Sequence, residues 1–316
     1  MNLLRDSVHA VTAFAPATCA NVAVGFDILG FAIDGVGDCV TLTRREDKQI
    51  VIDAIDSPAT LPLDVDKNTA SGVVKKFCQE LKIDTGFSIR ISKGIPLSSG
   101  MGGSAASAVA ALIACNAFLS VPLSASELVP YALFGEEIAS GQQHADNIVP
   151  CIFGGFTLVS SVQPLEVVQL PLMEFCCILV HPHLLVPTKE ARKILKEQLP
   201  LKDCIKQSAH LAAFIAALYK NDIRLLKKNL TDLLIEPQRA HFVPGFYKIK
   251  DAALKAGALG MSFSGSGPSL FAFAKNEVEA VRICAAMQEQ LKAENIDSDS
   301  WISSISQYGA RVQEIV

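Results

Sequence analysis

The sequence predicts an α+β protein built from two domains. Its 316 residues are about twice the length of a typical domain, and half of them are apolar, which is enough for two sizeable cores. Segments with strand-like and helix-like periodicity alternate along the chain, in two groups. We place the boundary near residues 161–171, which divides the chain into domains 1–165 and 166–316.

The first domain mixes strands and helices. Short runs rich in β-branched and apolar residues predict strands at 8–14, 39–44, 49–55, 87–92 and 152–160. Longer apolar patterns with polar starts predict helices at 69–81, 105–119 and 126–140. Asn68 or Thr69 would cap the first of these helices, and Ser124 or Ser126 the third.

The second domain repeats this mixture with more helix. We expect strands at 175–181, 269–274 and 300–306, the last being the final strand of the chain. We expect helices at 189–198, 204–219, 222–234, 245–256 and 277–294. Pro237 would end the third of these helices, and Gly257 is a typical residue to follow the fourth.

Composition excludes several classes of partner. The net charge of −4 and the pI near 5.9 argue against a nucleic-acid partner, since a surface that binds a phosphate backbone needs a basic excess. The nine cysteines show no C-x-x-C spacing and fit reduced thiols in a cytoplasmic protein. The longest apolar stretch, 105–119, is shorter than the ~20 residues that span a bilayer, so we expect no membrane partner. The apolar fraction leaves room for a homodimer.

A glycine-rich loop lies between the strand at 87–92 and the following helix. Backbone N–H groups in such a loop can approach an anion closely, and the helix N-terminus adds partial positive charge. No Gly-Lys-Ser/Thr triplet of a P-loop occurs, and a dinucleotide fingerprint on Gly100, Gly102 and Ala105 fits its context poorly. The loop is therefore a candidate phosphate cradle, and the alternative is a turn before a buried helix. We expect a side chain at Gly102 or Gly103 to intrude on the phosphate.

The loop and two other stretches resemble a known family. The pattern Pro96-x-x-x-Gly100-Met101-Gly102-Gly103-Ser104-Ala105 resembles the phosphate loop of the GHMP small-molecule kinases, with Met101 in place of Leu and Gly103 in place of the first Ser. Residues 15–30 and 260–269 resemble the first and third motifs of that family, the third being a glycine turn that closes on the phosphate loop. The resemblance implies that ATP contacts Pro96, Leu97, Ser98, Ser99, Gly100, Met101, Gly102, Gly103, Ser104 and Ala105.

Residues 135–147, 186–192 and 236–246 resemble the homoserine kinase branch of the family. The resemblance implies a ribosomal-S5-like first half and a ferredoxin-like second half, with the active site between them. It implies ATP-dependent, magnesium-assisted phosphorylation of the L-homoserine side-chain hydroxyl to O-phospho-L-homoserine, a step of threonine biosynthesis. Homoserine and ATP would then be the small-molecule partners.

Phosphoryl transfer needs a cradle, a divalent metal and positioning of the acceptor hydroxyl. The resemblance implies that Ser104 and Glu136 hold the magnesium ion, whereas Glu136 alone would read as an exposed helix carboxylate. Related kinases place an Asp base where this chain has Asn147. We therefore expect Asn147 to be catalytic through positioning, with no dedicated carboxylate base, and Asp146 not to act as one.

An amino-acid acceptor needs cations for its carboxylate and an anion for its ammonium. Arg192 and Arg239 are the candidate cations, because a guanidinium forks onto a carboxylate. Asp27 follows apolar residues and is either a buried structural partner or functional. The resemblance implies that Asp27 binds the ammonium and that further substrate contacts come from Asn21, His144 and Thr188.

Three other functions compete with this interpretation. A GHMP kinase for another acceptor is the nearest, but sugar and isoprenoid acceptors would not need Arg192 and Arg239. A Rossmann oxidoreductase would use the glycine loop for a dinucleotide. A non-catalytic sensor of the same fold would be expected to lack metal residues, yet Ser104 and Glu136 are both present.

Overall fold

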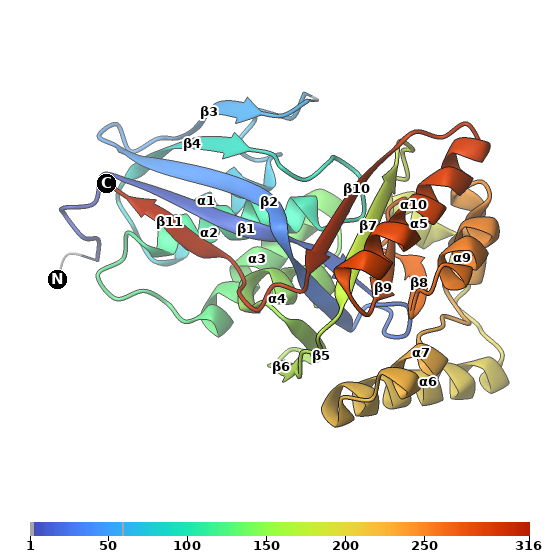
Figure 1. Cartoon of the computed structure of the whole chain (residues 1–316). Helices are drawn as coiled ribbons and strands as arrows, with labels where there is room; N and C mark the ends of the chain where they lie inside the picture. Colours follow the sequence, from blue (N-terminus) through green and yellow to red (C-terminus); the bar gives the residue numbers. More distant parts are fainter. Residues whose placement is uncertain (1–2, 59) are drawn as a thin grey trace.

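The computed structural model describes residues 3–58 and 60–316 and contains two β-sheets with helices packed on them (Figure 1). The larger sheet and its helices comprise β1 (Ala10–Ala20), β2 (Leu29–Arg45), β3 (Ile50–Asp56), β4 (Gly86–Ser92), β5 (Phe156–Val162), β6 (Leu165–Leu170) and β11 (Arg311–Ile315), with α1 (Thr69–Glu80), α2 (Gly103–Asn116), α3 (Ala125–Ser140) and α4 (Ala145–Phe153). The smaller sheet and the remaining helices comprise β7 (Cys176–Pro182), β8 (Gly260–Phe263), β9 (Leu270–Ala274) and β10 (Ser298–Ser304), with α5 (Thr188–Lys193), α6 (Leu201–Lys220), α7 (Ile223–Asn229), α8 (Glu236–Arg239), the 3₁₀ turn η1 (Ala240–Phe242), α9 (Phe246–Lys255) and α10 (Glu277–Ala293).

The larger sheet has the strand order β11-β1-β2-β4-β3, and β5 and β6 extend it beside β2. Its pairs are antiparallel except β3 with β4, so the parallel sheet of a Rossmann oxidoreductase is absent from the described residues. Helices α2 and α4 pack on β1 and β2, and α1 and α3 pack on α2. The glycine loop therefore leads from an inner strand, β4, into a helix that lies against the centre of the sheet.

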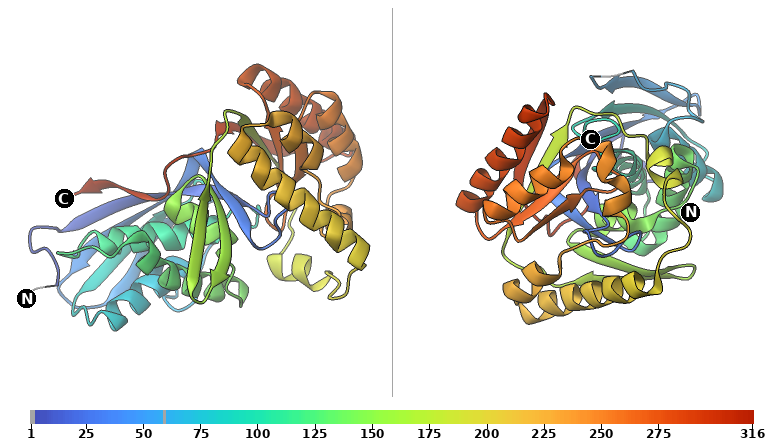
Figure 2. Two further views of the ribbon diagram at one scale, coloured as in Figure 1. Left: turned by 90° about the horizontal axis from the view of Figure 1, so that it is seen from below. Right: turned by 90° about the vertical axis from the view of Figure 1, so that its right-hand side faces the viewer.

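The smaller sheet has the order β10-β7-β9-β8 with every pair antiparallel. Numbered along the chain this order is 4-1-3-2, and α10 connects the last two strands, which is the ferredoxin-like arrangement. Helix α10 packs on this sheet and α9 packs beside α10, whereas α6 and α7 form a helical pair away from both (Figure 2). The predicted α+β class with a ferredoxin-like second half is confirmed.

Aromatic side chains join the two sheets. The ring of Phe31 on β2 lies 5.0 Å from that of Phe156 on β5 and 5.5 Å from that of Phe273 on β9, between ring centroids. All three side chains have no exposed surface. This shared core fixes the two halves relative to one another, which matters because the candidate site lies between them.

Helix α2 is buried on nearly every side, as its composition predicts. Most of its side chains are small, alanine being the commonest, and small side chains let β1, β2, α1 and α3 approach it closely. Helix α3 begins at Ser124, whose hydroxyl accepts from the Glu127 backbone N–H while the Glu127 carboxylate accepts in return from Ser124. Asn68 caps α1, so both helices have one of the two caps expected for them.

Several helices and strands were predicted wrongly from the sequence. Residues 145–153 continue as α4 through Pro150, so the strand expected at 152–160 begins only at Phe156. The helix expected at 222–234 ends at Asn229. Strands β6 and β8 were not predicted, and β10 is not the final strand, because β11 returns to pair with β1 (Figure 1). The three strands that were not predicted, β6, β8 and β11, are short, and each forms by pairing with the edge of another strand.

The segment at 161–171, where the boundary was expected, spans the turn and second strand of the β5–β6 hairpin. The chain crosses to the smaller sheet between β6 and β7. The division into domains 1–165 and 166–316 stays a prediction.

Within the described residues no helix is long and apolar enough to cross a membrane.

Candidate active site

A cavity of about 610 Å³ opens between the two halves. Of the residues predicted to bind ATP or substrate or to act in catalysis, sixteen line it: Asn21, Asp27, Pro96, Leu97, Ser98, Ser99, Gly100, Gly102, Gly103, Ser104, Glu136, His144, Asn147, Thr188, Arg192 and Arg239. The other two, Met101 and Ala105, are buried in the core and do not line it. The structure thus brings together segments that are up to 218 residues apart in the chain, from residue 21 to residue 239.

The glycine loop is held by direct backbone contact with the third motif. A Cβ at Gly100 would lie 2.5 Å from the Ser264 carbonyl oxygen and 2.7 Å from that of Gly267. The Ser264 hydroxyl donates to the Gly100 carbonyl at 2.9 Å, and the Ser269 N–H donates to the Ser99 carbonyl at 3.1 Å. The expected closure of one glycine turn on the other is therefore present, and only glycine fits at position 100.

Gly102 is required by its contacts within the protein. Its φ of +70° is unfavourable for other residues, and a Cβ would lie 2.1 Å from Thr18 Oγ1 and 3.0 Å from Asn147 Oδ1. The clash is thus with a protein hydrogen bond, since Thr18 Oγ1 donates to Asn147 Oδ1 at 2.8 Å. At Gly103 a Cβ would lie 3.3 Å from Ile95 Cγ2 and 3.5 Å from Lys93 Nζ, so only side-chain atoms would have to shift slightly. The expectation that a side chain at Gly102 or Gly103 would intrude on the phosphate stays a prediction.

A buried network of ionic and hydrogen-bonded groups anchors the glycine loop to β2 and α2. The Lys93 ammonium pairs with Asp38 and donates to the Gly103 carbonyl and the Ser107 hydroxyl, both at 2.9 Å. Asp38 also accepts from Ser107 and from the backbone N–H groups of Gly94 and Ile95. Because Asp38 is fully buried and meets four donor groups, the network ties β2, the loop and α2 together.

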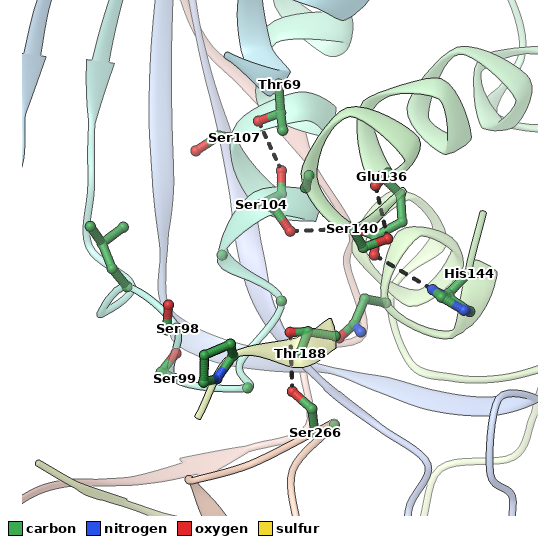
Figure 3. A pocket seen from close by; sticks show the side chains of 18 of the residues that line it. Thr69, Ser98, Ser99, Ser104, Ser107, Glu136, Ser140, His144, Thr188 and Ser266 are labelled. Atoms are coloured by element: carbon green, nitrogen blue, oxygen red, sulfur yellow. Dashed lines mark hydrogen bonds and ion pairs between the residues drawn. The ribbon is translucent and has the colours of Figure 1, made fainter. Parts of the chain in front are cut away.

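Ser104 and Glu136 come together at the start of α2 (Figure 3). The Ser104 hydroxyl donates to Glu136 Oε2 at 3.4 Å, and Oε1 of the same carboxylate lies 3.7 Å from His144 Nδ1. Both side chains line the cavity beside the glycine loop. Hydroxyl and carboxylate oxygens suit Mg²⁺, which takes one or two protein ligands and fills its shell with phosphate oxygens and water. No cluster of three or more His, Cys, Asp or Glu side chains is found as a metal cage in the part of the chain described.

Asp27 and Arg192 form a bidentate ion pair. The guanidinium donates from Nη1 to Asp27 Oδ2 at 2.8 Å and from Nη2 to Oδ1 at 2.6 Å. Burial lowers the pKa of Arg192, but the hydrogen bonds and charge of Asp27 outweigh it, so the net pKa is raised. Asn21 supports the pair, because its Oδ1 accepts from the Asp27 N–H and its Nδ2 donates to the Gly265 carbonyl. Thr188 lies near Ser266 of the third motif, with 3.3 Å between the hydroxyl oxygens (Figure 3).

Arg239 is a buried cation with no carboxylate partner among residues 3–58 and 60–316. It is 3% exposed, and it donates from Nε to the Ala191 carbonyl and from Nη1 to the Gly265 carbonyl, both at 3.1 Å. Burial lowers the pKa of Arg239 to about 10, and the charge of Arg192 adds to this effect. A desolvated guanidinium that faces a cavity is a strong site for an anionic ligand.

Helix α8 holds Arg239 in place. Asp232 accepts three backbone N–H bonds, from Leu234, Ile235 and Glu236, and so fixes the start of the turn. The Glu236 carboxylate then pairs with Lys250 on α9 and accepts from Ser262 on β8. These contacts explain how the charged side chains of Glu236 and Arg239 can be buried.

Asp146 is buried, lines the cavity and carries a perturbed carboxyl group. Burial raises its pKa to about 7, and the negative charge of Asp27 adds to the rise. The side chain follows His144 and precedes Asn147 at the start of α4. A carboxyl group in this state is partly protonated near neutral pH.

Sequence analysis missed several residues of the site. Thr18, which orients Asn147, and Phe26, whose ring lies 5.3 Å from the Cζ atoms of both Arg192 and Arg239, fall inside the first motif but were not singled out. Lys93 gave a weak signal as a charge directly before the glycine loop. Asp38 gave none, because its importance arises only when β2 pairs with β4 and brings it to the loop.

Two family models match the chain. The GHMP kinases N terminal domain matches residues 68–155, and the GHMP kinases C terminal model matches residues 214–293. A homoserine kinase from Chloroherpeton thalassium is 46% identical, covering 96% of this chain and 99% of the relative. The crystal structure of a homoserine kinase from Cytophaga hutchinsonii has a TM-score of 0.94 at 42% identity and covers 98% and 99% of the two chains. The L. major mevalonate kinase in complex with R-mevalonate is 17% identical with a TM-score of 0.70, covers 96% and 99% of the two chains, and shares the fold.

A Gly102→Ala substitution should remove activity while Gly103→Ser keeps most of it. The first places a methyl group against the Thr18–Asn147 hydrogen bond at a backbone angle that costs about 1–2 kcal/mol for an L-residue. The second adds a side chain where only the side chain of Ile95, 3.3 Å from the new Cβ, would have to shift slightly. Steady-state turnover together with the melting temperatures of both variants checks this. Equal losses of turnover in the two variants would contradict it.

Replacing Asp146 by Asn should change how stability depends on pH. The pKa of Asp146 is 3.8 in its unperturbed state and about 7 when folded, so ionisation destabilises the fold increasingly between these values. The free energy of unfolding of Asp146→Asn relative to wild type should rise from pH 4 to pH 7, by up to about 1.4 kcal/mol per pH unit, and level off above pH 7. Urea unfolding measured across that range provides the test.

The exposed acid Asp34 supplies the control for this measurement, because Asp34→Asn removes the same charge outside the cavity and should follow the wild-type profile. Parallel profiles for wild type and Asp146→Asn would show that Asp146 is not held in a protonated state.

Proposed function

The chain belongs to the homoserine kinase family of the GHMP kinases, and we propose that it transfers the γ-phosphoryl group of ATP to the side-chain hydroxyl of L-homoserine. The product would be O-phospho-L-homoserine, the intermediate that threonine biosynthesis consumes.

One observation carries the proposal for the acceptor. A single cavity holds the glycine loop of residues 96–104 and, beside it, the charged residues Asp27, Arg192 and Arg239. A phosphate cradle together with charges of both signs suits a reaction between a nucleoside triphosphate and a small zwitterion. A neutral sugar would leave both Asp27 and Arg239 without a function, and an acceptor such as mevalonate, which has a carboxylate but no ammonium group, would leave Asp27 without one.

At the acceptor end, we propose that the buried guanidinium of Arg239 binds the substrate carboxylate together with Arg192. Asp27 would bind the ammonium, and Asn21 keeps Asp27 in position through its backbone N–H. His144 and Thr188 line the same cavity and would contact the substrate from the sides of α4 and α5. With both charged ends held, the hydroxyl is the part of homoserine left to reach the phosphate.

At the phosphate end, we propose that the loop N–H groups and the N-terminus of α2 bind the triphosphate. Ser104 and Glu136 would hold Mg²⁺, which when bound neutralises charge on the phosphate oxygens. Asn147 uses its carbonyl oxygen to accept from Thr18, which leaves its NH₂ group to donate to an oxygen of a substrate. This positioning is the catalytic role we propose for Asn147.

We propose that no carboxylate acts as general base. A general base contributes ~10²–10⁴-fold to the rate, whereas a loose phosphoryl-transfer transition state depends mainly on positioning and charge neutralisation. Asp146→Asn should therefore cost less than that range in turnover, and a loss within it would make Asp146 the base. A homodimer and a cytoplasmic location stay predictions.

The activity is tested by an ADP-release assay with Mg-ATP and four acceptors: L-homoserine, mevalonate, galactose and shikimate. We expect turnover with homoserine alone. Glu136→Gln provides the matched control for background ATP hydrolysis, because it removes a proposed metal ligand while preserving size. Turnover with another acceptor at a higher rate would replace homoserine as the substrate.

Arg239→Ala should lower kcat/KM for homoserine by a factor of about 30 to several thousand and leave ATP affinity unchanged. Removing one partner of a desolvated charge pair costs about 2–5 kcal/mol, at about 1.4 kcal/mol per tenfold. Homoserine amide should show a similar loss with the wild-type enzyme. The two losses should not add, since both remove the same contact. Additive losses, or an equal loss of ATP affinity, would show that Arg239 does not bind the carboxylate.

A further inference from the structure

The two groups that would bind opposite ends of the amino acid are bound to each other. Asp27 and Arg192 make two hydrogen bonds, at 2.6 and 2.8 Å, inside the cavity. Their side chains are 32% and 28% exposed, so a ligand in the cavity can reach both of them. The contact that a substrate ammonium would make with Asp27 is therefore already occupied, and by a cation of this chain.

The Asp27–Arg192 pair leaves one buried donor group without a partner in the part of the chain that the structure describes. Arg192 Nε is buried and has no hydrogen-bond partner among the described residues, although the other two nitrogens of the guanidinium are bonded to Asp27. Asp27 has a φ of +63°, a left-handed conformation that aspartate and asparagine tolerate better than most residues. The pair thus leaves one donor of Arg192 unused.

Arg239 behaves differently from Arg192. It is anchored by the backbone carbonyls of Ala191 and Gly265 and is not engaged by Asp27. Both guanidinium groups lie 5.3 Å from the centre of the Phe26 ring, so they share one neighbourhood. Arg239 is a fixed site for an anion, whereas Arg192 is bound to a carboxylate of the protein, that of Asp27.

We propose that the Asp27–Arg192 ion pair is a placeholder that a zwitterionic amino acid displaces. The substrate ammonium takes the place of Arg192 on Asp27, and the freed guanidinium joins Arg239 on the substrate carboxylate. One ion pair is broken and two ends of the substrate are bound, so each end assists the binding of the other. The inference rests on the proposed function, because it assumes that Asp27 and the two arginines bind the acceptor.

The exchange explains selectivity against ligands with one charge. An acid without an ammonium group has nothing to displace Arg192 from Asp27, and it meets only Arg239. An amine without a carboxylate would break the pair and leave Arg192 without an anion. Selection for α-amino acids is then a property of the coupled pair and exceeds what two independent contacts would provide.

The test is calorimetric binding of 4-hydroxybutyrate, which is homoserine without its ammonium group, to wild type and to Asp27→Asn. Asparagine tolerates positive φ, so this variant keeps the backbone. We expect Asp27→Asn to bind 4-hydroxybutyrate about tenfold tighter than wild type while losing affinity for homoserine. The gain should vanish in Asp27→Asn/Arg192→Met, because it arises from the freed guanidinium.

Glu190→Gln is the matched control, since it removes one negative charge from the exposed surface of α5, two residues from Arg192. It should leave the affinity for 4-hydroxybutyrate unchanged. Unchanged or weaker binding by Asp27→Asn would overturn the exchange, and so would an equal gain in Glu190→Gln, which would indicate a general charge effect.

A second measurement needs no variant. Propylammonium should tighten 4-hydroxybutyrate binding to the wild-type protein compared with sodium chloride of equal ionic strength, because it supplies the displacing cation separately. No difference between the two salts would also count against the exchange. A wild-type protein that phosphorylates homoserine but fails these tests loses only this inference, whereas one that does not phosphorylate homoserine loses the proposed function.

Discussion

The site depends on a backbone-to-backbone contact between two glycine turns. Gly100 belongs to the loop before α2, and Gly265 and Gly267 belong to the turn before β9. No side chain fits between Gly100 and the carbonyl oxygens of Ser264 and Gly267. Because one turn comes from each half of the protein, this contact sets the width of the cavity and fixes the phosphate loop relative to the substrate residues.

The Gly265 carbonyl group links the contact between the two glycine turns to the residues that would bind the substrate. The Gly265 oxygen accepts from Asn21 Nδ2 at 2.8 Å and from Arg239 Nη1 at 3.1 Å. Asn21 in turn holds the backbone of Asp27. The residues that would bind the amino acid are therefore oriented by the same turn that holds the phosphate loop. A shift of that turn would change both ends of the site together, which suits a reaction that must align a donor with an acceptor.

The charges of the cavity are placed at an energetic cost to the fold. Arg239 is buried without an acidic partner among the described residues, and burial lowers its pKa to about 10. Asp146 is buried near Asp27, and its pKa is raised to about 7. An orphaned donor such as Arg192 Nε costs about 1–3 kcal/mol. Such arrangements are typical of ligand sites, because the ligand supplies the missing partners.

Local sequence determined the parts of this protein that depend on neighbouring residues. The strand, glycine loop and helix around residues 87–119, the caps of α1 and α3, and the α+β class follow from periodicity, turn residues and capping chemistry.

The resemblance to family motifs then identified the residues that line the cavity. What it could not supply was which of them touch. That Asp27 engages Arg192, that Asn147 is held by Thr18 and that Asp38 anchors the loop are contacts between residues more than fifty positions apart in the chain. The segments of β6, β8 and β11 are short and become strands only because a partner edge is present, on β5, β9 and β1. Tertiary structure decided these contacts, because the energy of a buried polar pair or a strand edge depends on its partner and not on its neighbours in the chain.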